Sequence, residues 1–201
     1  MSRRAYESPL RERQAQQTRD DVLDALVALL SDRAVDEVTT KEVARAAGVS
    51  ERTVYRHFPD RTALVEGLTA RFMSSGNRVP TTPERLHDLP SVAVELMRVL
   101  EAHHVEAQAE ALLNADPRRF TTRTTVHTEQ FREMVGTGLP QLDTDQQQSL
   151  AAVLRVLFSA QTWLRMRAEF GIDGDESGPI IAWAIEALTN EVERGNPPPT
   201  R

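Results

Sequence analysis

The 201-residue chain contains no cysteine, which excludes disulfide bonds and thiolate metal sites. It also has no run of roughly 18 apolar residues, so no membrane-spanning helix is expected. The N-terminal stretch is polar, whereas a secretory signal peptide needs an apolar run of roughly 7 to 15 residues. Lysine is nearly absent too, because Lys41 is the only lysine among 24 basic side chains. We therefore expect a cytoplasmic protein without membrane contact.

Acidic residues outnumber basic ones, and the net charge is -6. The two parts of the chain contribute unequally to this charge. Residues 1–78 carry 13 basic and 12 acidic side chains, a balance of +1, whereas residues 79–201 carry 11 and 18, a balance of -7. A partner such as nucleic acid senses local charge rather than the overall isoelectric point. The acidic total therefore does not exclude nucleic-acid binding by the first part.

Helical patterns run through the whole chain, and no β-hairpin signal interrupts them. The spacing of Val22, Leu26, Leu29 and Leu30 predicts a first helix over about 17–32, preceded by a flexible arm that carries Arg11 and Arg13. A linker rich in proline and threonine at 79–83 divides the chain into two parts. The sequence therefore predicts an all-α fold with domains at 1–78 and 79–201.

The stretch 39–58 reads as two short helices joined by a tight turn. Thr39 and Glu42 have the spacing of a capping box, which predicts the start of the first helix. Gly48 ends that helix, since glycine tolerates the left-handed conformation of a sharp turn. Ser50 is a second N-cap, and the helix after it directs Val54 and Phe58 inward. This helix-turn-helix pattern places its second helix in the DNA major groove.

These residues resemble a known family. The run from Thr39 to Ser50, the run from Thr53 to Phe58 and the motif Arg61-x-x-Leu64 are similar to the TetR family of bacterial transcriptional regulators. The resemblance implies a three-helix helix-turn-helix DNA-binding domain joined to a C-terminal helical domain that binds ligand and forms dimers. The specific match covers about 17–65, and the rest of the chain matches only in architecture.

The resemblance also implies which residues bind DNA. Base contacts fall to residues of the second helix and its neighbour: Arg52, Thr53, Lys41 and Arg56. Arginine can bind guanine through two hydrogen bonds, and the threonine methyl can contact thymine. Phosphate contacts fall to Thr40, Tyr55, His57 and Arg61, and Arg61 would act with the first N–H groups of a helix capped by Asp60. Glu51 either reads a cytosine amino group or caps the helix.

Two helices of the second part are apolar on more than one side, which requires burial on most sides. The first is predicted to run without a break from Thr144, in a capping box with Gln147, to about Phe170. The last is predicted to open at Pro179. A homodimer would bury both helices, and the alternative is core packing in one chain. The predicted interface residues are Trp163, Ile180, Trp183, Ala184 and Leu188.

A ligand cavity is expected inside the second part, between helices at 90–104, 118–135 and 145–169. The alternative is that its apolar residues are ordinary core. The composition favours an apolar or amphipathic small molecule, and no cofactor or metal site is expected. The predicted lining residues are Leu96, Leu100, His104, Phe120, Phe131, Leu154, Phe158 and Gln161.

The favoured function is a repressor that binds a palindromic double-stranded DNA operator and is released by a small-molecule ligand. An activator would use the same parts. An enzyme is not expected, because the chain has no cysteine nucleophile, Gly-rich phosphate loop or Glu-x-x-His pair. A helix-turn-helix fold used only for protein contacts remains as a third alternative.

Overall fold

The computed structural model describes residues 9–30, 33, 37–74, 80–113 and 122–200. These residues form α-helices and one short 3₁₀ helix, with no strand among them, which confirms the all-α fold. The chain divides into two compact units between Arg71 and Phe72, inside a helix. The boundary predicted after residue 78 lies outside the described residues and stays a prediction. We call the two parts the head unit and the C-terminal unit.

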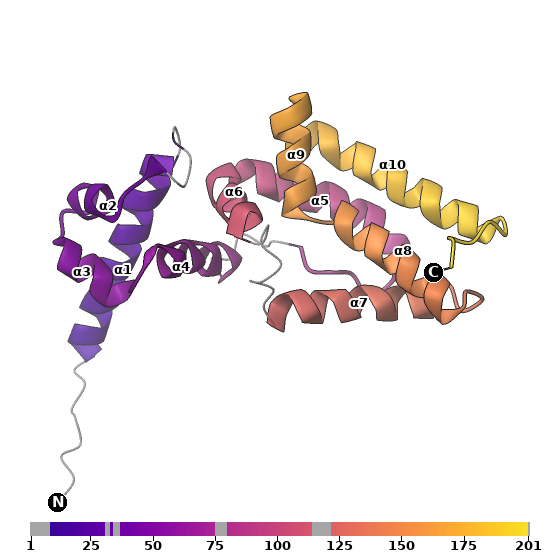
Figure 1. The fold of residues 1–201 in the computed structure, drawn as a ribbon, viewed down its shortest axis with the longest axis horizontal. Coiled ribbons are helices and arrows are strands. Elements are labelled where there is room, and N and C mark those ends of the chain that lie inside the picture. The colour runs from indigo at the N-terminus through magenta and orange to yellow at the C-terminus, as the bar shows by residue number, and fades with distance from the viewer. Residues whose placement is uncertain (1–8, 31–32, 34–36, 75–79, 114–121, 201) are drawn as a thin grey trace, which may run out of the picture. The chain divides into compact units, whose positions relative to one another are not determined.

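The head unit consists of three helices and most of a fourth. Their apolar sides meet in a small core that includes Val22, Leu26, Val54 and Phe58, each at most 3% exposed. The first helix begins earlier than predicted, at Pro9, so that Arg11 and Arg13 lie on a helix and are exposed. In chain order the helices are α1 (Pro9–Leu30), α2 (Thr40–Ala46), α3 (Glu51–His57) and α4 (Arg61–Ser74) (Figure 1).

The C-terminal unit is a bundle in which α5 packs along α10, and α7 packs along α8 (Figure 1). Its core contains Leu89, Met97, Leu154 and Ile185, each at most 2% exposed. The elements are η2 (Leu86–Asp88), α5 (Leu89–Ala102), α6 (His104–Leu113), α7 (Thr122–Gly138), α8 (Thr144–Leu157), α9 (Ala160–Phe170) and α10 (Gly174–Glu193). None of the described helices has the length and hydropathy of a membrane span.

The long apolar helix predicted from Thr144 to Phe170 is wrong as a single helix, because it breaks into α8 and α9. Ser159 takes an extended conformation, and its side-chain oxygen accepts a hydrogen bond of 3.2 Å from the Thr162 amide. A serine that caps a new helix cannot also continue the previous one. The predicted cap of α8 is also displaced by one residue: the capping box joins Asp143 to Gln146 rather than Thr144 to Gln147.

The last helix begins five residues before the predicted Pro179. Asp173 and Glu176 form a capping box, and the Asp173 carboxylate accepts a hydrogen bond of 3.0 Å from the Glu176 amide. Two glycines near this end bring the backbones of α10 and α5 together. A Cβ on Gly174 would lie 2.4 Å from the Met97 carbonyl oxygen, and one on Gly178 would lie 3.1 Å from Val94 Cα.

Candidate nucleic-acid interface

The turn between α2 and α3 sets the direction of the second helix. Gly48 has a φ of 68°, the left-handed conformation expected of it. Its amide donates a hydrogen bond to the Arg45 carbonyl (3.2 Å), and the Val49 amide donates to the Ala44 carbonyl (3.0 Å). These two bonds form a Schellman motif, which satisfies the last carbonyl groups of α2. The chain therefore changes direction within the three residues before Ser50.

The starts of these helices are capped as predicted. Thr39 and Glu42 form a reciprocal capping box at α2. The Ser50 side chain accepts a hydrogen bond of 3.1 Å from the Thr53 amide at α3. At α4, the Asp60 carboxylate accepts a hydrogen bond of 2.8 Å from the Ala63 amide. Side-chain caps therefore satisfy amides at the starts of α2, α3 and α4, each through a residue visible in the sequence.

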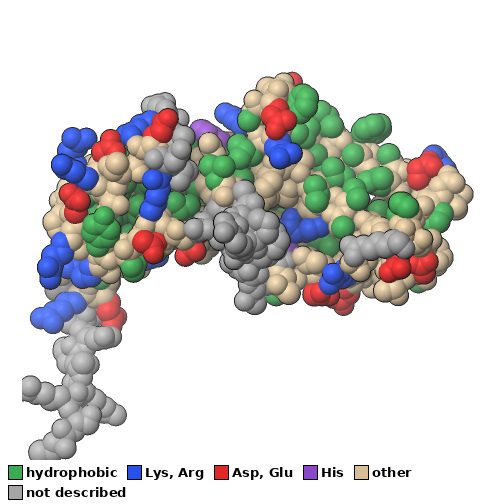
Figure 2. All heavy atoms as spheres, in the orientation of Figure 1, with side chains coloured by type: hydrophobic (Ala, Val, Ile, Leu, Met, Phe, Trp, Pro, Cys, Tyr) green, Lys and Arg blue, Asp and Glu red, His purple; other side chains and the backbone are tan. Residues whose placement is uncertain are grey.

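The short α3 has one buried and one exposed side. Val54 is 0% exposed, and Phe58 directly after the helix is 1% exposed. Glu51, Arg52 and Arg56 are exposed, and Tyr55 is 49% exposed although it is a large aromatic residue. Figure 2 shows Lys and Arg side chains on the surface of the head unit, with fewer acidic groups between them. The exposed side of α3 thus presents two guanidinium groups and a phenol together.

The other predicted contact residues lie on α2, α3 and α4. Lys41 and Arg61 are exposed at the first turns of α2 and α4, and Thr40 is half-buried. The Thr53 side chain is also half-buried, and its hydroxyl lies 2.9 Å from the Ser50 hydroxyl. Because that hydroxyl belongs to the cap, the methyl group is the part of Thr53 left for a thymine contact.

His57 differs from a simple phosphate contact. Its Nε2 is buried and makes no hydrogen bond within the described structure. Burial lowers the pKa of His57, and the nearby positive charges of Arg56 and Arg19 lower it further. The imidazole is therefore neutral near pH 7, so that a bond to phosphate would come from a neutral N–H group rather than an ion pair. Ser50 rather than Glu51 supplies the observed cap of α3, and the cytosine contact of Glu51 stays a prediction.

Sequence reasoning missed three residues that hold the helix-turn-helix in place. The Arg19 guanidinium lies 4.3 Å from the centre of the Phe58 ring and donates a hydrogen bond of 3.3 Å to the His57 carbonyl. Gly67 on α4 leaves room for this pair, because a Cβ there would lie 2.5 Å from Phe58 Cε1. An isolated glycine within an apolar helical pattern was the available signal for this close approach.

The third missed residue is Arg33, whose Nη1 lies 2.8 Å from Glu42 Oε1. The hydrogen bonds from Arg33 and Thr39 lower the pKa of Glu42 from 4.5 to about 2. The carboxylate of the capping box is thus also the partner of an ion pair. Nothing in the local pattern signalled Arg33, because it lies in a connection without helical periodicity.

The comparisons with known proteins agree with this geometry. The family profile described as bacterial regulatory proteins, tetR family, matches residues 22–68. The head unit of this chain is a TetR-family DNA-binding domain. The match spans α2 and α3 together with the apolar parts of α1 and α4. It therefore covers the interface residues described above.

Relatives of this protein include the nucleoid occlusion factor SlmA of Haemophilus influenzae, which is 31% identical over 121 residues. That match covers 51% of this chain and 56% of SlmA, so the chain spans about half the length of this curated relative. The solved structure of NalD from Pseudomonas aeruginosa, described as the secondary repressor of the MexAB-OprM multidrug efflux pump, shares the fold. It has a TM-score of 0.55 at 21% identity, over 87% of this chain and 96% of NalD.

A variant of TetR from Acinetobacter baumannii AYE, solved in complex with minocycline, also shares the fold. Its TM-score is 0.58 at 17% identity, over 87% of this chain and 96% of that chain. Both solved structures cover most of this chain, whereas the family profile covers only the head unit. The likeness therefore confirms the two-part architecture: a helix-turn-helix domain followed by a helical domain.

The predicted ligand residues lie in the C-terminal unit, most of them in its core. Leu96, Leu100, Phe131, Leu154 and Phe158 are each at most 6% exposed, and the rings of Phe131 and Phe158 are 5.8 Å apart. His104 is exposed and Gln161 is half-buried. Phe120 lies outside the described residues. The ligand-binding role of this set stays a prediction.

The predicted interface residues separate into two groups. Ile180, Trp183 and Leu188 on α10 are 42%, 68% and 36% exposed, and Ala184 beside them is half-buried. Trp163 is 0% exposed, and its Nε1 donates a hydrogen bond of 2.9 Å to Glu101 Oε2. Its place at an interface was therefore wrong: an internal carboxylate partner holds this indole in the core of one chain.

Proposed function

We propose that this protein is a transcriptional repressor that binds a palindromic operator as a homodimer and is released by a small-molecule ligand. Its head unit has the DNA-binding fold of TetR-family regulators. The proposal adds three things to that fold: the contact residues, the dimer and the response to a ligand. An activator built on the same parts is the alternative, and the two differ in the position of the operator relative to the promoter.

The observation that carries DNA binding is the exposed side of α3. Arg52, Tyr55 and Arg56 project from a helix that is capped at Ser50 and anchored by Val54 and Phe58. Such a rigid, half-buried helix can enter the major groove with its N-terminal residues against base edges. We assign base contacts to Arg52, Thr53, Lys41 and Arg56, and phosphate contacts to Thr40, Tyr55, His57 and Arg61.

An apolar surface on the C-terminal unit supports the homodimer. Val153, Val156, Phe170, Ile180 and Trp183 are each at least 42% exposed in one chain. Hydrophobic side chains gather over α8, α9 and α10 in Figure 2. Exposed apolar patches of this kind mark interaction surfaces. A two-fold dimer through α8 and α10 would direct two head units at successive major grooves, about 34–36 Å apart.

The ligand response follows from the two-part architecture. A ligand that binds one conformation of the C-terminal unit better than another shifts the population toward it. If that conformation spaces the head units wrongly for the operator, binding of ligand and DNA oppose each other by the same coupling free energy. The description of NalD as a repressor and the minocycline bound to TetR support this assignment by analogy of fold.

The test of DNA binding is selection of bound sequences from a random duplex pool, followed by titration at several salt concentrations. A palindrome with a steep loss of affinity at high salt supports the proposal, since phosphate contacts release counterions. Arg52→Ala should weaken operator binding by about tenfold or more, the value of one good base contact. Tyr55→Phe should weaken it less, through one lost phosphate contact.

Two controls accompany these variants. Arg165→Ala removes the same charge from an exposed position on α9 and should leave operator affinity unchanged. Sedimentation should show the same dimer for all three variants. Operator affinity equal to wild type in both head-unit variants would overturn the contact assignment. Salt-insensitive behaviour with no selected sequence would overturn DNA binding and favour a protein-contact module.

A further inference from the structure

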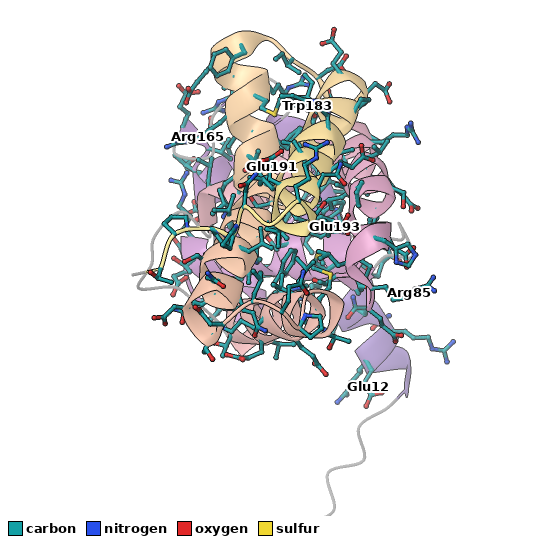
Figure 3. The ribbon with its side chains drawn as sticks, turned by 90° about the vertical axis from the view of Figure 1, so that its right-hand side faces the viewer. Glu12, Arg85, Arg165, Trp183, Glu191 and Glu193 are labelled. Atoms are coloured by element: carbon teal, nitrogen blue, oxygen red, sulfur yellow. The ribbon has the colours of Figure 1, made fainter. Side chains whose placement is uncertain are left out.

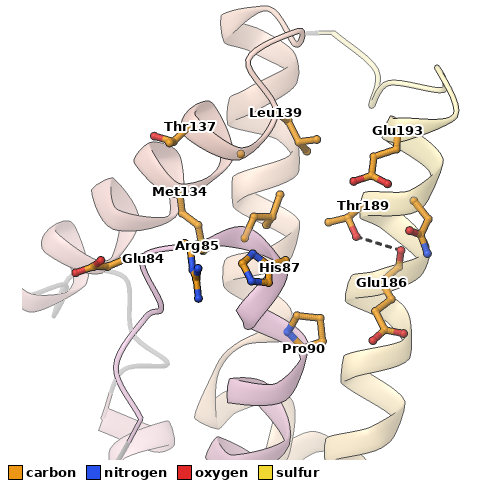
Figure 4. Close-up of a pocket in the computed structure, with 13 residues that line it drawn as sticks. Glu84, Arg85, His87, Pro90, Met134, Thr137, Leu139, Glu186, Thr189 and Glu193 are labelled. Carbon is orange, nitrogen blue, oxygen red and sulfur yellow. Dashed lines mark hydrogen bonds between the residues drawn. The ribbon is translucent and has the colours of Figure 1, made fainter.

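The end of the C-terminal unit contains a hollow of about 450 Å³ that the predicted ligand cavity does not include. It lies where η2 and the start of α5, the end of α7 and the last turns of α10 come together (Figure 4). None of the described residues predicted to bind ligand lines it. Its volume falls within the range of small-molecule sites in proteins.

The floor of the hollow is apolar. Leu86, Pro90, Met134 and Leu139 line it, and Gly138 lets α7 approach η2 closely. A Cβ on Gly138 would lie only 3.0 Å from Leu86 Cβ. This surface suits the hydrocarbon body of a ligand, because burying apolar area is favourable wherever it occurs.

The walls of the hollow are acidic. Glu186 and Glu193 lie seven residues apart on α10, which places them on one side of the helix about 10.5 Å apart along its axis. Figure 4 shows both carboxylates extending from α10 toward the hollow, whereas the Thr189 hydroxyl donates back to the carbonyl groups of Ile185 and Glu186. Glu84 also lines the hollow, from the segment before η2, with its carboxylate directed away from α10 in Figure 4.

The basic groups of the hollow do not cancel this charge. Arg85 and His87 also line it, but both contact the same carboxylate outside the lining. Arg85 Nε lies 3.0 Å from Asp88 Oδ2, and His87 Nε2 lies 3.0 Å from Asp88 Oδ1. The guanidinium is therefore already paired, which leaves the three glutamates of the lining to determine the sign of the local field. An anion is disfavoured in such a hollow, and a cation is favoured.

The hollow lies beside the proposed dimer interface on α10. At roughly 100° per residue, Ala184 and Leu188 of the proposed interface lie roughly 140–180° around α10 from Glu186 and Glu193, whereas Trp183 lies only about 60–80° from them. Figure 3 shows Glu193 on the same side of the unit as Arg85, which lines the hollow from η2. A partner chain centred on Ala184 and Leu188 would therefore leave the acidic wall open, with Trp183 at the border between the two surfaces.

The geometry points to a binding site for an amphipathic organic cation: an apolar body on the floor and an ammonium group between Glu186 and Glu193. This inference rests on the proposed function, because it names the ligand class that the C-terminal unit would sense. Binding itself needs no DNA. The site and the DNA-binding role can therefore fail separately.

The experiment uses the full chain without DNA and three matched probes: 4-phenylbutylamine, 4-phenylbutan-1-ol and 4-phenylbutyrate. Calorimetry gives the affinities, and ¹⁵N NMR shows whether the Thr189 and Asn190 amides shift. The amine should bind at least tenfold more tightly than the alcohol, and the carboxylate should bind most weakly. Equal affinities, no detectable binding of the amine, or shifts confined to other residues would overturn the site.

Substitution separates the site from general charge effects. The double variant Glu186→Gln with Glu193→Gln should reduce amine affinity to that of the alcohol, while alcohol binding stays unchanged. Glu133→Gln removes one exposed carboxylate from α7 outside the hollow and should bind all three probes like wild type. All these positions are exposed, so the helical circular dichroism should not change. Amine affinity that survives the double variant would overturn the inference, whatever the outcome for DNA.

Discussion

The contacts that stabilise each unit internally differ between the head unit and the C-terminal unit. In the head unit, the caps and the turn that define α2 and α3 join residues close in sequence: Thr39 with Glu42, Ser50 with Thr53, and the turn at Gly48. The C-terminal unit depends on contacts between distant segments. Glu101 on α5 accepts hydrogen bonds from Trp163 Nε1 and from the Gly174 amide, and it pairs with Arg167, so that one carboxylate joins α5, α9 and α10.

The difference explains what each unit can do. Local caps fix a short α3 at the surface of a small unit, which leaves its outer side open for DNA. Long-range packing builds a larger core with an apolar surface beside it, and such a unit can bind another chain or a ligand. Substitutions that disturb packing in the C-terminal unit should therefore lower the free energy of unfolding most. Substitutions of helix caps should lower it less.

The largest effect is expected from Gly174→Ala. The new Cβ would lie 2.4 Å from both the Met97 carbonyl oxygen and Glu101 Cβ, and a backbone atom cannot move aside easily. Overpacking of this kind should lower the free energy of unfolding by about 3 kcal/mol. Chemical denaturation followed by tryptophan fluorescence measures it, because Trp163 contacts Glu101. Gly136→Ala is the control, since its Cβ would meet only the Gln147 side chain, at 3.2 Å.

A smaller effect is expected from Gly67→Ala. This variant tests whether the head unit also depends on contacts between residues distant in sequence. Its Cβ would lie 2.5 Å from Phe58 Cε1 and 3.1 Å from Arg19 Nη2, so the ring that anchors α3 must shift. We expect a loss of about 2 kcal/mol in the head unit, together with weaker operator binding. Hydrogen exchange in α3 measures the first effect. Unchanged protection of the α3 amides would show that Phe58 does not position this helix.

Ser50→Ala should have a smaller effect again. The variant removes the oxygen that accepts the Thr53 amide at the start of α3, and loss of an N-cap costs about 1 kcal/mol. Exchange of the α3 amides should rise accordingly, while α10 keeps its protection. Ser50→Asp, which restores an N-cap acceptor, should recover the protection of α3. A loss as large as that of Gly174→Ala would contradict the contrast between the two units.

The same contrast decides what could be predicted from sequence. Thr39, Gly48, Ser50 and Asp60 act on residues within four positions, so their roles could be predicted before any fold was known. The ends of α8 and α10 were missed although they too are capped locally. Thr144 competes with Asp143 as a cap, and apolar periodicity continues across Ser159.

Contacts between distant residues could not be predicted in this way. Trp163 reads as one more apolar residue on an apolar helix, and its partner Glu101 lies 62 positions away. The pairing of Arg19 with Phe58 and the hollow beside Glu186 likewise join separate elements. A single sequence shows that such residues are apolar or charged, but it does not show which of them meet.

The smallest expected effect is a pH dependence of stability that arises from Glu42. Its carboxylate takes part both in the cap with Thr39 and in the ion pair with Arg33. Hydrogen bonds from Arg33 and Thr39 lower the pKa of Glu42 from 4.5 to about 2. Between these values the unfolded chain binds more protons than the folded chain, so stability rises with pH. The contribution is therefore fully present above pH 4.5 and is lost as the pH falls toward 2.

Glu42→Gln isolates this contribution. The difference in unfolding free energy between wild type and the variant should be constant from about pH 7 to 5.5 and should shrink as the pH falls further. Arg33→Ala should produce the same trend, because it removes the largest cause of the lowered pKa. Hydrogen exchange of the α2 amides at each pH measures both variants. A difference that does not change with pH would show that the ion pair adds nothing to the cap, and that the head unit is stabilised at this point by its local hydrogen bonds alone.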